Sequence, residues 1–307
     1  MYVCKCFKYY SLHFFYMHRY LYKNIRVKFF MLILMLSLSV SAQQRRALVI
    51  GLGEQEDKAW AKINGDKDVA LVKSYLSDAG YGYIKTLVNK EATKKNIVNE
   101  FERLTSLSKD GDIVYIHFSG HGQQMKDFND DEADLFDECW IPYDAYLKCC
   151  DADNGSKHLN DDEINNLLSK LKSKIGVNGK ILVIVDACHS GDSSRGNSHE
   201  TYRGTMDRFY PTEDAESLNL STSKEDWIII SACKDYQRNA ELITDKGQYG
   251  KLTYALYSLL NAKEKSSMSN MRLYNYICRF FDRNRGSLQQ TPVMKGVLAR
   301  FNISDIL

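Results

Sequence analysis

Two short apolar segments of the chain each lead to a residue that can take part in nucleophilic catalysis. The segment 183–185 leads to Cys188, and the segment 113–116 leads to His121. Runs of β-branched residues form buried parallel strands, and the carboxyl ends of such strands meet at one edge of a sheet. An imidazole placed there beside a thiol can accept the thiol proton and later give it to a leaving amine. These two residues predict hydrolysis of peptide bonds by a cysteine.

Backbone N–H groups must stabilise the negative oxygen that forms when the cysteine attacks. Gly122 follows the histidine, and glycine lets the backbone approach a ligand closely. We therefore expect the amides of Gly122 and Cys188 to form the oxyanion site. His189 adjoins the cysteine, but neighbouring side chains on a turn point apart, so we interpret it as a turn residue. His117 lies inside its strand and is expected to pack in the core.

The rest of the chain alternates short apolar segments with amphipathic ones. We predict strands near 45–51, 83–88, 113–118, 180–186, 226–232 and 292–298. We predict helices near 66–76, 92–107, 159–171, 252–260 and 271–281, the third of them capped by Asn160. This order predicts an α/β fold, a three-layer αβα sandwich with a mostly parallel sheet of about six strands.

The length and charge of the chain narrow the classes of function. The 307 residues are 44% hydrophobic, enough for one large core. Six of the 41 basic residues and none of the 39 acidic residues lie in 1–42. The remainder therefore carries a small net negative charge and has no basic stripe, so no nucleic-acid partner is expected.

The first 42 residues resemble a targeting segment rather than part of the fold. Residues 29–40 form an apolar run, which follows Arg26 and Lys28 and precedes the small residues Ser41 and Ala42. The run is shorter than the roughly 20 residues of a membrane-spanning helix and fits a secretory signal peptide. We expect a peptidase domain at 43–307 that is exported, periplasmic or secreted, without a membrane span after signal removal. An N-terminal anchor is the alternative. A signal peptide at 29–40 makes residues 1–26 superfluous, and we interpret them as a gene-model artefact with translation starting at Val27.

Three motifs, in order, carry a resemblance to a known family. They are Phe118–Gly122 (FSGHG), Asp137–Asp144 (DECWIPYD) and Asp186–Gly191 (DACHSG). Ile229–Cys233 and Leu252–Leu256 also match. Over residues 45–300 the chain resembles the caspase-fold cysteine peptidases of clan CD, family C14, in their metacaspase-like branch. The resemblance implies an αβα sandwich, a Cys188–His121 dyad and a protein or peptide substrate.

The resemblance also implies which side chain precedes the cut bond. Metacaspases cut after Arg or Lys and line the primary pocket with carboxylates, because a buried cation needs a paired anion. By resemblance, Asp186, Ser119 and Asp68 would line that pocket. Asp186 as a simple turn residue is the alternative.

An acidic segment of the sequence suggests a cation-binding site. Seven acids occupy residues 127–138: Asp127, Asp130, Asp131, Glu132, Asp134, Asp137 and Glu138. Oxygen ligands suit Ca²⁺. By resemblance to calcium-activated metacaspases, Asp161 and Asp162 would bind it, with Asp137 as a third ligand. The chemistry itself needs no cofactor. A solvated acidic loop and an ordinary acidic helix N-terminus are the alternative.

The segment 193–225 is polar and without period, and we interpret it as a long, mobile loop. It contains Arg195, Arg203, Arg208 and Lys224, so the resemblance implies self-cleavage here; an unprocessed loop is the alternative.

Two other functions stay open. One is a catalytically silent caspase-fold binding or regulatory protein, and the other is an Asp-specific, caspase-type intracellular protease. Pairing among the six cysteines beyond residue 42 is not determined by their spacing.

Overall fold

The computed structural model describes residues 43–127, 135–188, 200–212, 226–261, 268–287, 289–299 and 301–307. Residues 44–307 form one compact unit. Its centre is a six-stranded sheet with the order β11-β8-β7-β3-β1-β2. The strands are β1 (Arg45–Gly51), β2 (Tyr83–Val88), β3 (Ile113–Ser119), β7 (Lys180–Asp186), β8 (Ile228–Ser231) and β11 (Val293–Gly296). All neighbouring strands are parallel except β11, which runs antiparallel to β8.

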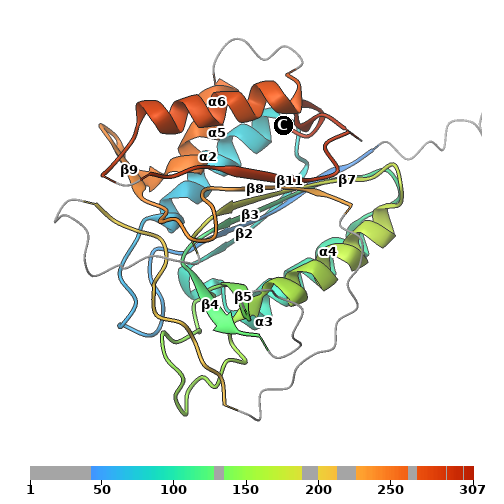
Figure 1. The fold of residues 1–307 in the computed structure, drawn as a ribbon. Helices are drawn as coiled ribbons and strands as arrows, with labels where there is room; N and C mark the ends of the chain where they lie inside the picture. The colour runs from blue at the N-terminus through green and yellow to red at the C-terminus, as the bar shows by residue number, and fades with distance from the viewer. Residues whose placement is uncertain are drawn as a thin grey trace, which may run out of the picture. The chain divides into compact units, whose positions relative to one another are not determined.

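Helices cover both faces of this sheet. Figure 1 shows α2 (Gly65–Asp78), α5 (Lys251–Asn261) and α6 (Asn270–Arg283) on one face, and α3 (Lys94–Leu107) and α4 (Asp161–Ile175) on the other. Short 3-10 turns lie at Asn89–Glu91 and Ile303–Asp305. The predicted three-layer αβα sandwich with a mostly parallel, six-stranded sheet is confirmed.

Alternation along the strands divides the core into two layers. In β7, Leu182 and Ile184 pack with the α2, α5 and α6 side, whereas Ile181, Val183 and Val185 pack with α3 and α4. Successive strand side chains point to opposite faces, so Asp186 continues the Leu182–Ile184 series toward α2 and α5. In β3, Ser119 continues the series of Tyr115 and His117 toward the same face.

The local signals in the sequence account for several element boundaries. In α4, the Asn160 side chain accepts a hydrogen bond from the Glu163 amide while Glu163 reaches back to the Asn160 amide, the predicted capping box. In α3, Thr93 caps the first turn by accepting from the Asn96 amide. The central strands β3 and β7 are buried almost throughout, as expected of strands covered on both faces.

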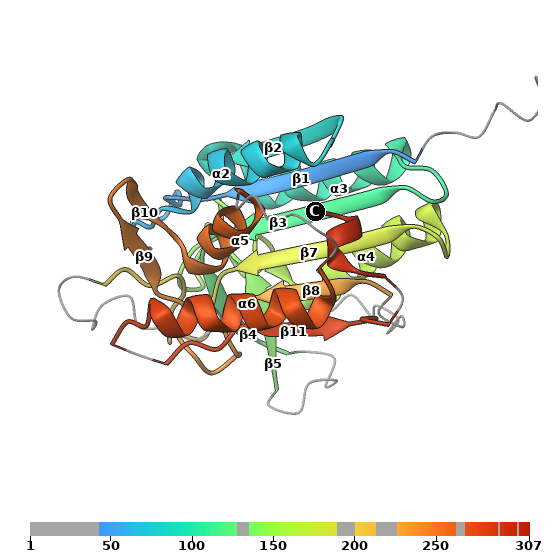
Figure 2. The ribbon, with the colours of Figure 1, turned by 90° about the horizontal axis from the view of Figure 1, so that it is seen from above.

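Two smaller sheets, which the sequence did not predict, lie beside the main one. A three-stranded sheet contains β4 (Gly122–Lys126), β5 (Phe136–Trp140) and β6 (Leu159–Asn160), and a hairpin contains β9 (Glu241–Thr244) and β10 (Gly247–Gly250). Figure 2 shows the hairpin near the carboxyl ends of the parallel strands. These short elements furnish much of the candidate site.

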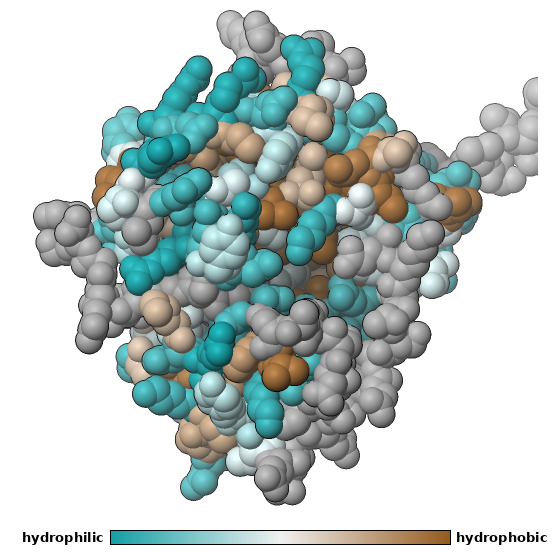
Figure 3. Space-filling model, viewed as in Figure 1, coloured by the Kyte–Doolittle hydropathy of each residue, from teal (hydrophilic) through white to brown (hydrophobic). Residues whose placement is uncertain are grey.

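In the view of Figure 3, the hydrophobic side chains of the described residues form separate groups among hydrophilic ones. Within the described residues, no helix combines the length and apolar character needed to cross a membrane. The predicted signal segment lies outside the described residues.

Candidate active site

The ladder between β3 and β7 sets the positions of His121 and Cys188. Its last register pair is Ser119 with Asp186. Each chain continues two residues beyond that pair, to His121 and to Cys188 respectively. Both side chains are buried at the carboxyl edge of the sheet. The parallel register therefore brings the two predicted residues to equivalent places on neighbouring strand ends.

Backbone and aromatic contacts fix the His121 imidazole. Its Nε2 lies 2.8 Å from the carbonyl oxygen of Ala61, and its ring stacks on Trp60 at 4.9 Å between centroids. A carbonyl only accepts hydrogen bonds, so Nε2 must carry the proton and donate it. Nδ1 is then an unprotonated acceptor, and it has no hydrogen-bond partner among the described residues. Sequence reasoning missed Ala61 because a backbone carbonyl leaves no signature in the sequence.

The pKa of His121 is lowered to about 4. Burial is the main cause and the nearby Arg203 charge acts in the same direction, whereas the Ala61 hydrogen bond opposes the shift. The imidazole is therefore neutral at pH 7 and keeps a free electron pair at Nδ1. A neutral imidazole of this kind is able to accept a proton from a thiol.

A second cysteine shares the surroundings of Cys188. The Cys188 Sγ donates to the Gln237 carbonyl oxygen at 2.6 Å, and Cys233 Sγ lies 3.4 Å from the same oxygen. The hydrogen bond with Cys188 and burial raise the pKa of Cys233 well above its usual value. Cys233 therefore remains a thiol, and Cys188 is free of any disulfide.

Three carboxylates gather beside the strand ends. Asp68 comes from α2, Asp186 from the end of β7 and Glu241 from β9, and all three side chains are buried. Ser119 donates to Asp68, and the Gly250 amide donates to the same carboxylate at 3.0 Å. The predicted residues Asp68, Ser119 and Asp186 thus lie together. Glu241 was not predicted, because a short hairpin strand gave no signal in the sequence.

Asp186 and Asp68 differ in protonation behaviour. Burial raises the pKa of Asp186, but the Arg203 charge and hydrogen bonds from Asn239 and Thr253 outweigh burial and hold this pKa below its usual value. Burial raises the pKa of Asp68 to about 6, against the lowering effect of Arg203. Asp68 is therefore the carboxyl of this pair that first takes up a proton as the pH falls.

The Arg203 side chain occupies the space between the carboxylates and is fully buried. Its Nη1 donates to Asp68 at 2.7 Å and to Ser119 at 2.6 Å, and it lies 3.8 Å from an Asp186 oxygen. Its Nε and Nη2 donate to Glu241 Oε1 at 3.1 and 3.0 Å. The pocket that was predicted to accept a basic side chain holds a guanidinium of the same chain.

The backbone around Arg203 pairs antiparallel with residues 239–241, at the start of β9. The Arg203 amide donates to the Asn239 carbonyl at 2.9 Å, and the Glu241 amide donates to the Thr201 carbonyl at 2.8 Å. Tyr202 and Ala240 form the antiparallel bridge between them. An extended peptide paired with a strand edge is a common arrangement of bound peptides.

The residues that follow Arg203 pass close to Cys188. A Cβ on Gly204 would overlap the Cys188 carbonyl oxygen and lie 3.2 Å from the Cys188 Cβ, so only glycine allows this approach. Further along, Phe209 pairs with β4 through its amide to the Gln124 carbonyl at 2.8 Å. The mobile-loop interpretation is therefore wrong for residues 200–212, because buried side chains and strand pairing order them. Residues 193–199 and 213–225 lie outside the described residues.

A chain of buried hydrogen bonds lies beneath the pocket. The Thr253 hydroxyl donates to Asp186 at 2.7 Å, so its contact with His117 Nε2 at 3.2 Å must be donated by the imidazole. His117 Nδ1 then accepts from the Tyr115 hydroxyl at 3.0 Å, which contacts Tyr75. Burial lowers the pKa of His117 to about 3, consistent with a neutral ring. His117 is a buried core residue, as predicted, and it also supports the pocket.

Other predicted residues take these places. Gly122 is buried at the start of β4, next to His121. Asp137 is buried in β5 and accepts from Asn160 at 2.9 Å, while Asp161 and Asp162 begin α4. Within the described part of the chain, no group of three or more His, Cys, Asp or Glu side chains is arranged to hold a metal ion. His189 and four of the seven acids, at 130–134, lie outside it.

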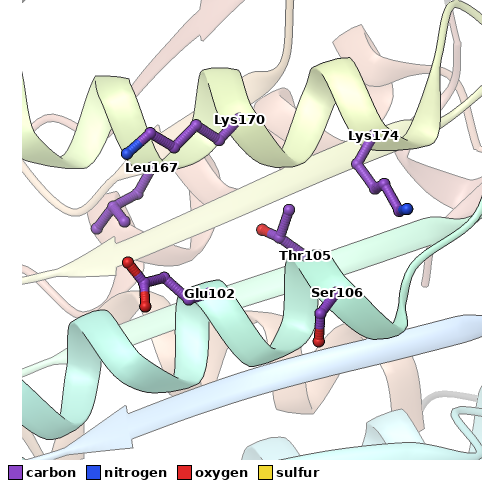
Figure 4. Close-up of a pocket in the computed structure, with 6 residues that line it drawn as sticks. All are labelled: Glu102, Thr105, Ser106, Leu167, Lys170 and Lys174. Carbon is purple, nitrogen blue, oxygen red and sulfur yellow. The ribbon is translucent and has the colours of Figure 1, made fainter.

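A separate hollow of about 250 Å³ lies between α3 and α4. Figure 4 shows its lining residues on these two helices, among them Glu102, Lys170 and Lys174. It contains none of the candidate site residues, so the strand ends remain the candidate active site.

Comparisons with known sequences identify the family of this chain. The profile of the caspase domain, peptidase family C14, matches residues 44–301. Metacaspase-2 of Arabidopsis thaliana is 28% identical over 260 residues, which cover 79% of this chain and 59% of that protein. Metacaspase-1B of Neosartorya fischeri is 32% identical over 284 residues, covering 76% of this chain and 65% of that protein. The chain thus spans less than two thirds of each relative's length.

Solved structures support the fold. A crystal structure of a Geobacter sulfurreducens protein superposes with a TM-score of 0.58 at 22% identity, covering 83% of this chain and 94% of that one. Caspase-1 from Spodoptera frugiperda gives a TM-score of 0.56 at 11% identity, covering 83% and 86%. The shared feature is the arrangement of sheet and helices.

Proposed function

The chain belongs to the caspase-domain family of cysteine peptidases, and we propose that it is an endopeptidase that cuts peptide bonds after basic residues. Cys188 is the proposed nucleophile and His121 the proposed general base. The observation that carries this proposal is the position of Arg203. Its guanidinium lies among three buried carboxylates, and the next residue, Gly204, contacts Cys188.

The proposed reaction uses the groups at the two strand ends. His121 Nδ1, the nitrogen without a partner, accepts the thiol proton as the Cys188 sulfur attacks the substrate carbonyl carbon. The amides of Gly122 and Cys188 stabilise the resulting oxyanion. The imidazolium then protonates the leaving amine, which leaves a thioester on Cys188. Water, activated by the same imidazole, attacks the thioester and releases the carboxylate product and the thiol.

The proposed specificity follows from charge. An Asp side chain in this pocket would add a fourth negative charge to a buried group of three carboxylates, and this is unfavourable. A basic side chain compensates that charge, as Arg203 does. The pocket therefore favours cutting after Arg or Lys over the Asp-specific alternative.

We propose that the first substrate is the chain itself, at the Arg203–Gly204 bond within the predicted self-cleavage segment. Residues 201–203 pair with residues 239–241 at the start of β9, and Phe209 pairs with β4. The close approach of Gly204 to Cys188 supports this choice of bond. Cutting it would free the segment and let the pocket exchange Arg203 for another substrate.

The test of the function is hydrolysis of short fluorogenic peptides that end in Arg, Lys, Asp or Asn by purified 43–307. Activity on Arg or Lys peptides that is lost in Cys188→Ala and in His121→Ala supports the proposal. A folded wild-type protein that cuts none of the peptides, even after release of Arg203, would instead favour the catalytically silent binding protein.

Calcium is a proposed activator. Burial, and then the charges of Asp137, Asp161 and Glu163, raise the pKa of the buried Cys139, so this region carries a negative charge that a cation would relieve. Asn160, which donates to Asp137 at 2.9 Å, directly precedes the predicted ligands Asp161 and Asp162. These residues do not form a ready-made metal site among the described residues. Isothermal titration with Ca²⁺, followed by rate measurements, tests the proposal. The absence of both binding heat and a rate change would exclude calcium as an activator.

We also propose export of the protein, from the apolar run at 29–40 that follows Arg26 and Lys28. Expression of the full chain and sequencing of the mature N-terminus test this proposal. A mature protein beginning near residue 43 and recovered outside the cytoplasm is the expected result.

A further inference from the structure

Glu241 lies at the start of β9, and its buried carboxylate faces one edge of the guanidinium in the pocket. We propose that Glu241 makes this pocket select arginine over lysine. This inference rests on the proposed function, because it concerns the basic side chain that the pocket accepts. Neither the sequence motifs nor the family relationship assigns a role to this residue.

The carboxylates contact different parts of Arg203. Asp68 and Ser119 receive hydrogen bonds from Nη1, the end of the side chain nearest Asp186. Glu241 Oε1 receives hydrogen bonds from Nε and Nη2, at 3.1 and 3.0 Å. The guanidinium is planar and has donors along two edges, so it contacts both groups at once.

Lysine cannot reproduce this arrangement. Its charge is a single ammonium at the end of a flexible chain, and nothing corresponds to the Nε donor of arginine. An ammonium that reaches Asp68 and Ser119 leaves Glu241 buried without its two donors from the ligand. A buried carboxylate that loses its hydrogen bonds is costly, so lysine is disfavoured by the unpaired acceptor as well as by the lost contact.

Glu241 is held in position from the other side. The Asn64 amide donates to Oε1 at 2.6 Å, and the Asn64 side chain donates to Oε2 at 2.5 Å. The Asn64 side chain also contacts Gln248 in β10 at 3.1 Å. The carboxylate is therefore oriented toward the guanidinium edge before a ligand arrives, which is the condition for discrimination by geometry.

Peptide hydrolysis tests the inference. Substrates built from residues 201–203, Thr-Tyr-Arg and Thr-Tyr-Lys, each carry a fluorogenic amide, and kcat/KM is measured for both. We expect the wild type to prefer Arg by roughly tenfold or more, since two directed hydrogen bonds separate the ligands. In Glu241→Gln the Arg/Lys ratio falls toward one, mainly through a higher KM for the Arg peptide.

The control is a carboxylate on the same hairpin. Asp245 lies in the exposed turn between β9 and β10, and Asp245→Asn should leave the Arg/Lys ratio unchanged. Glu241→Asp keeps the charge but shortens the arm, so it should also lower the ratio. An Arg/Lys ratio in Glu241→Gln equal to that of the wild type would overturn the inference.

A second measurement does not depend on catalysis. In a Cys188→Ala background, which keeps the chain intact, urea unfolding is measured for Arg203→Lys, Glu241→Gln and the double variant. We expect Arg203→Lys to lower the unfolding midpoint clearly when Glu241 is present and by less than half as much when it is replaced. Equal shifts in both backgrounds overturn the inference. Coupling in this cycle without hydrolysis of any peptide would leave the selective pocket supported and the proposed endopeptidase function refuted.

Discussion

Ser119 and Asp186 are the last register partners of the β3–β7 ladder, and both point toward the face covered by α2 and α5. Two residues beyond them lie His121 and Cys188. One pair of strand ends therefore supplies two residues of the proposed substrate pocket and both members of the proposed dyad. This relationship fixes the distance between the proposed substrate pocket and the proposed dyad, because both depend on the same ladder.

The rate of hydrolysis of Arg and Lys peptides should fall at low pH because Asp68 in the proposed pocket takes up a proton, and not because the proposed general base His121 does. Burial raises the pKa of Asp68 to about 6, whereas burial lowers the pKa of His121 to about 4. As the pH falls through 6, Asp68 takes up a proton and loses its attraction for a cation, while His121 stays neutral. We expect kcat/KM for Arg peptides to fall by roughly tenfold between pH 7 and pH 5.

Asp68→Asn separates the two groups. This variant should be slow throughout and nearly flat between pH 5 and pH 7, because the titrating carboxyl is gone. If kcat/KM of Asp68→Asn still fell near pH 6 as in the wild type, another group would be responsible for the fall.

Self-cleavage should depend on Arg203 and not on its neighbour Arg208. Arg203 is buried in the pocket, whereas Arg208 is exposed and lies over the Phe136 ring. Intact-mass and N-terminal analysis of the purified protein should show a new N-terminus at Gly204. Arg203→Ala and Cys188→Ala should abolish it, and Arg208→Ala should leave it.

The segment is tied to β9 and β4 of its own chain, so the cleavage should follow first-order kinetics whose rate constant is independent of protein concentration. Cleavage only after other basic residues, or a rate constant that rises with concentration, would contradict the proposed intramolecular bond.

Thr253 should act as a positioning residue for the pocket. Its hydroxyl and amide both donate to the same Asp186 oxygen, at 2.7 and 2.8 Å, and the hydroxyl links this carboxylate to His117. Thr253→Val keeps the shape but removes the hydroxyl. Asp186 then loses a donor and the His117 Nε2–H loses its acceptor, at a cost of about 1–3 kcal/mol in the free energy of unfolding.

We expect Thr253→Val to raise KM for Arg peptides several-fold with a smaller change in kcat, because the proposed role of Asp186 is to bind the basic side chain and not to transfer a proton. Thr253→Ser retains the hydroxyl and should restore the wild-type KM. Equal effects of the two substitutions would show that the methyl group, and not the hydrogen bond, matters.

Gly250 should tolerate no side chain. A Cβ there would overlap the Asp186 carboxylate and lie 2.5 Å from Arg203 Nη1, so the pocket exists only with glycine at this position. Gly250→Ala should lower the free energy of unfolding by about 1–3 kcal/mol through overpacking and strongly reduce cleavage of Arg peptides. Urea unfolding and peptide assays measure the two effects.

Gly82→Ala is the matched control, since a Cβ at Gly82 meets no atom within 4 Å. It should leave both properties near wild type. Full activity in Gly250→Ala would contradict the assignment of this pocket to the basic side chain.

The sequence by itself determined the layers and the strand ends. Continuous apolar runs predicted β3 and β7, and helical spacing with the Asn160 cap predicted α4, because burial and capping leave local, periodic signals. The same patterns, with the family motifs, predicted Cys188 and His121 as the dyad. That assignment of roles stays a prediction.

Only the tertiary structure decided what completes the site. Arg203 meets Asp68 across 135 residues of sequence and Glu241 across 38, and His121 meets the Ala61 carbonyl across 60. Such contacts depend on how separate elements pack, and a side chain in an irregular segment looks the same in sequence whether it is solvated or buried. Periodicity reports which face of an element is buried; it carries no information on which distant residue will be found there.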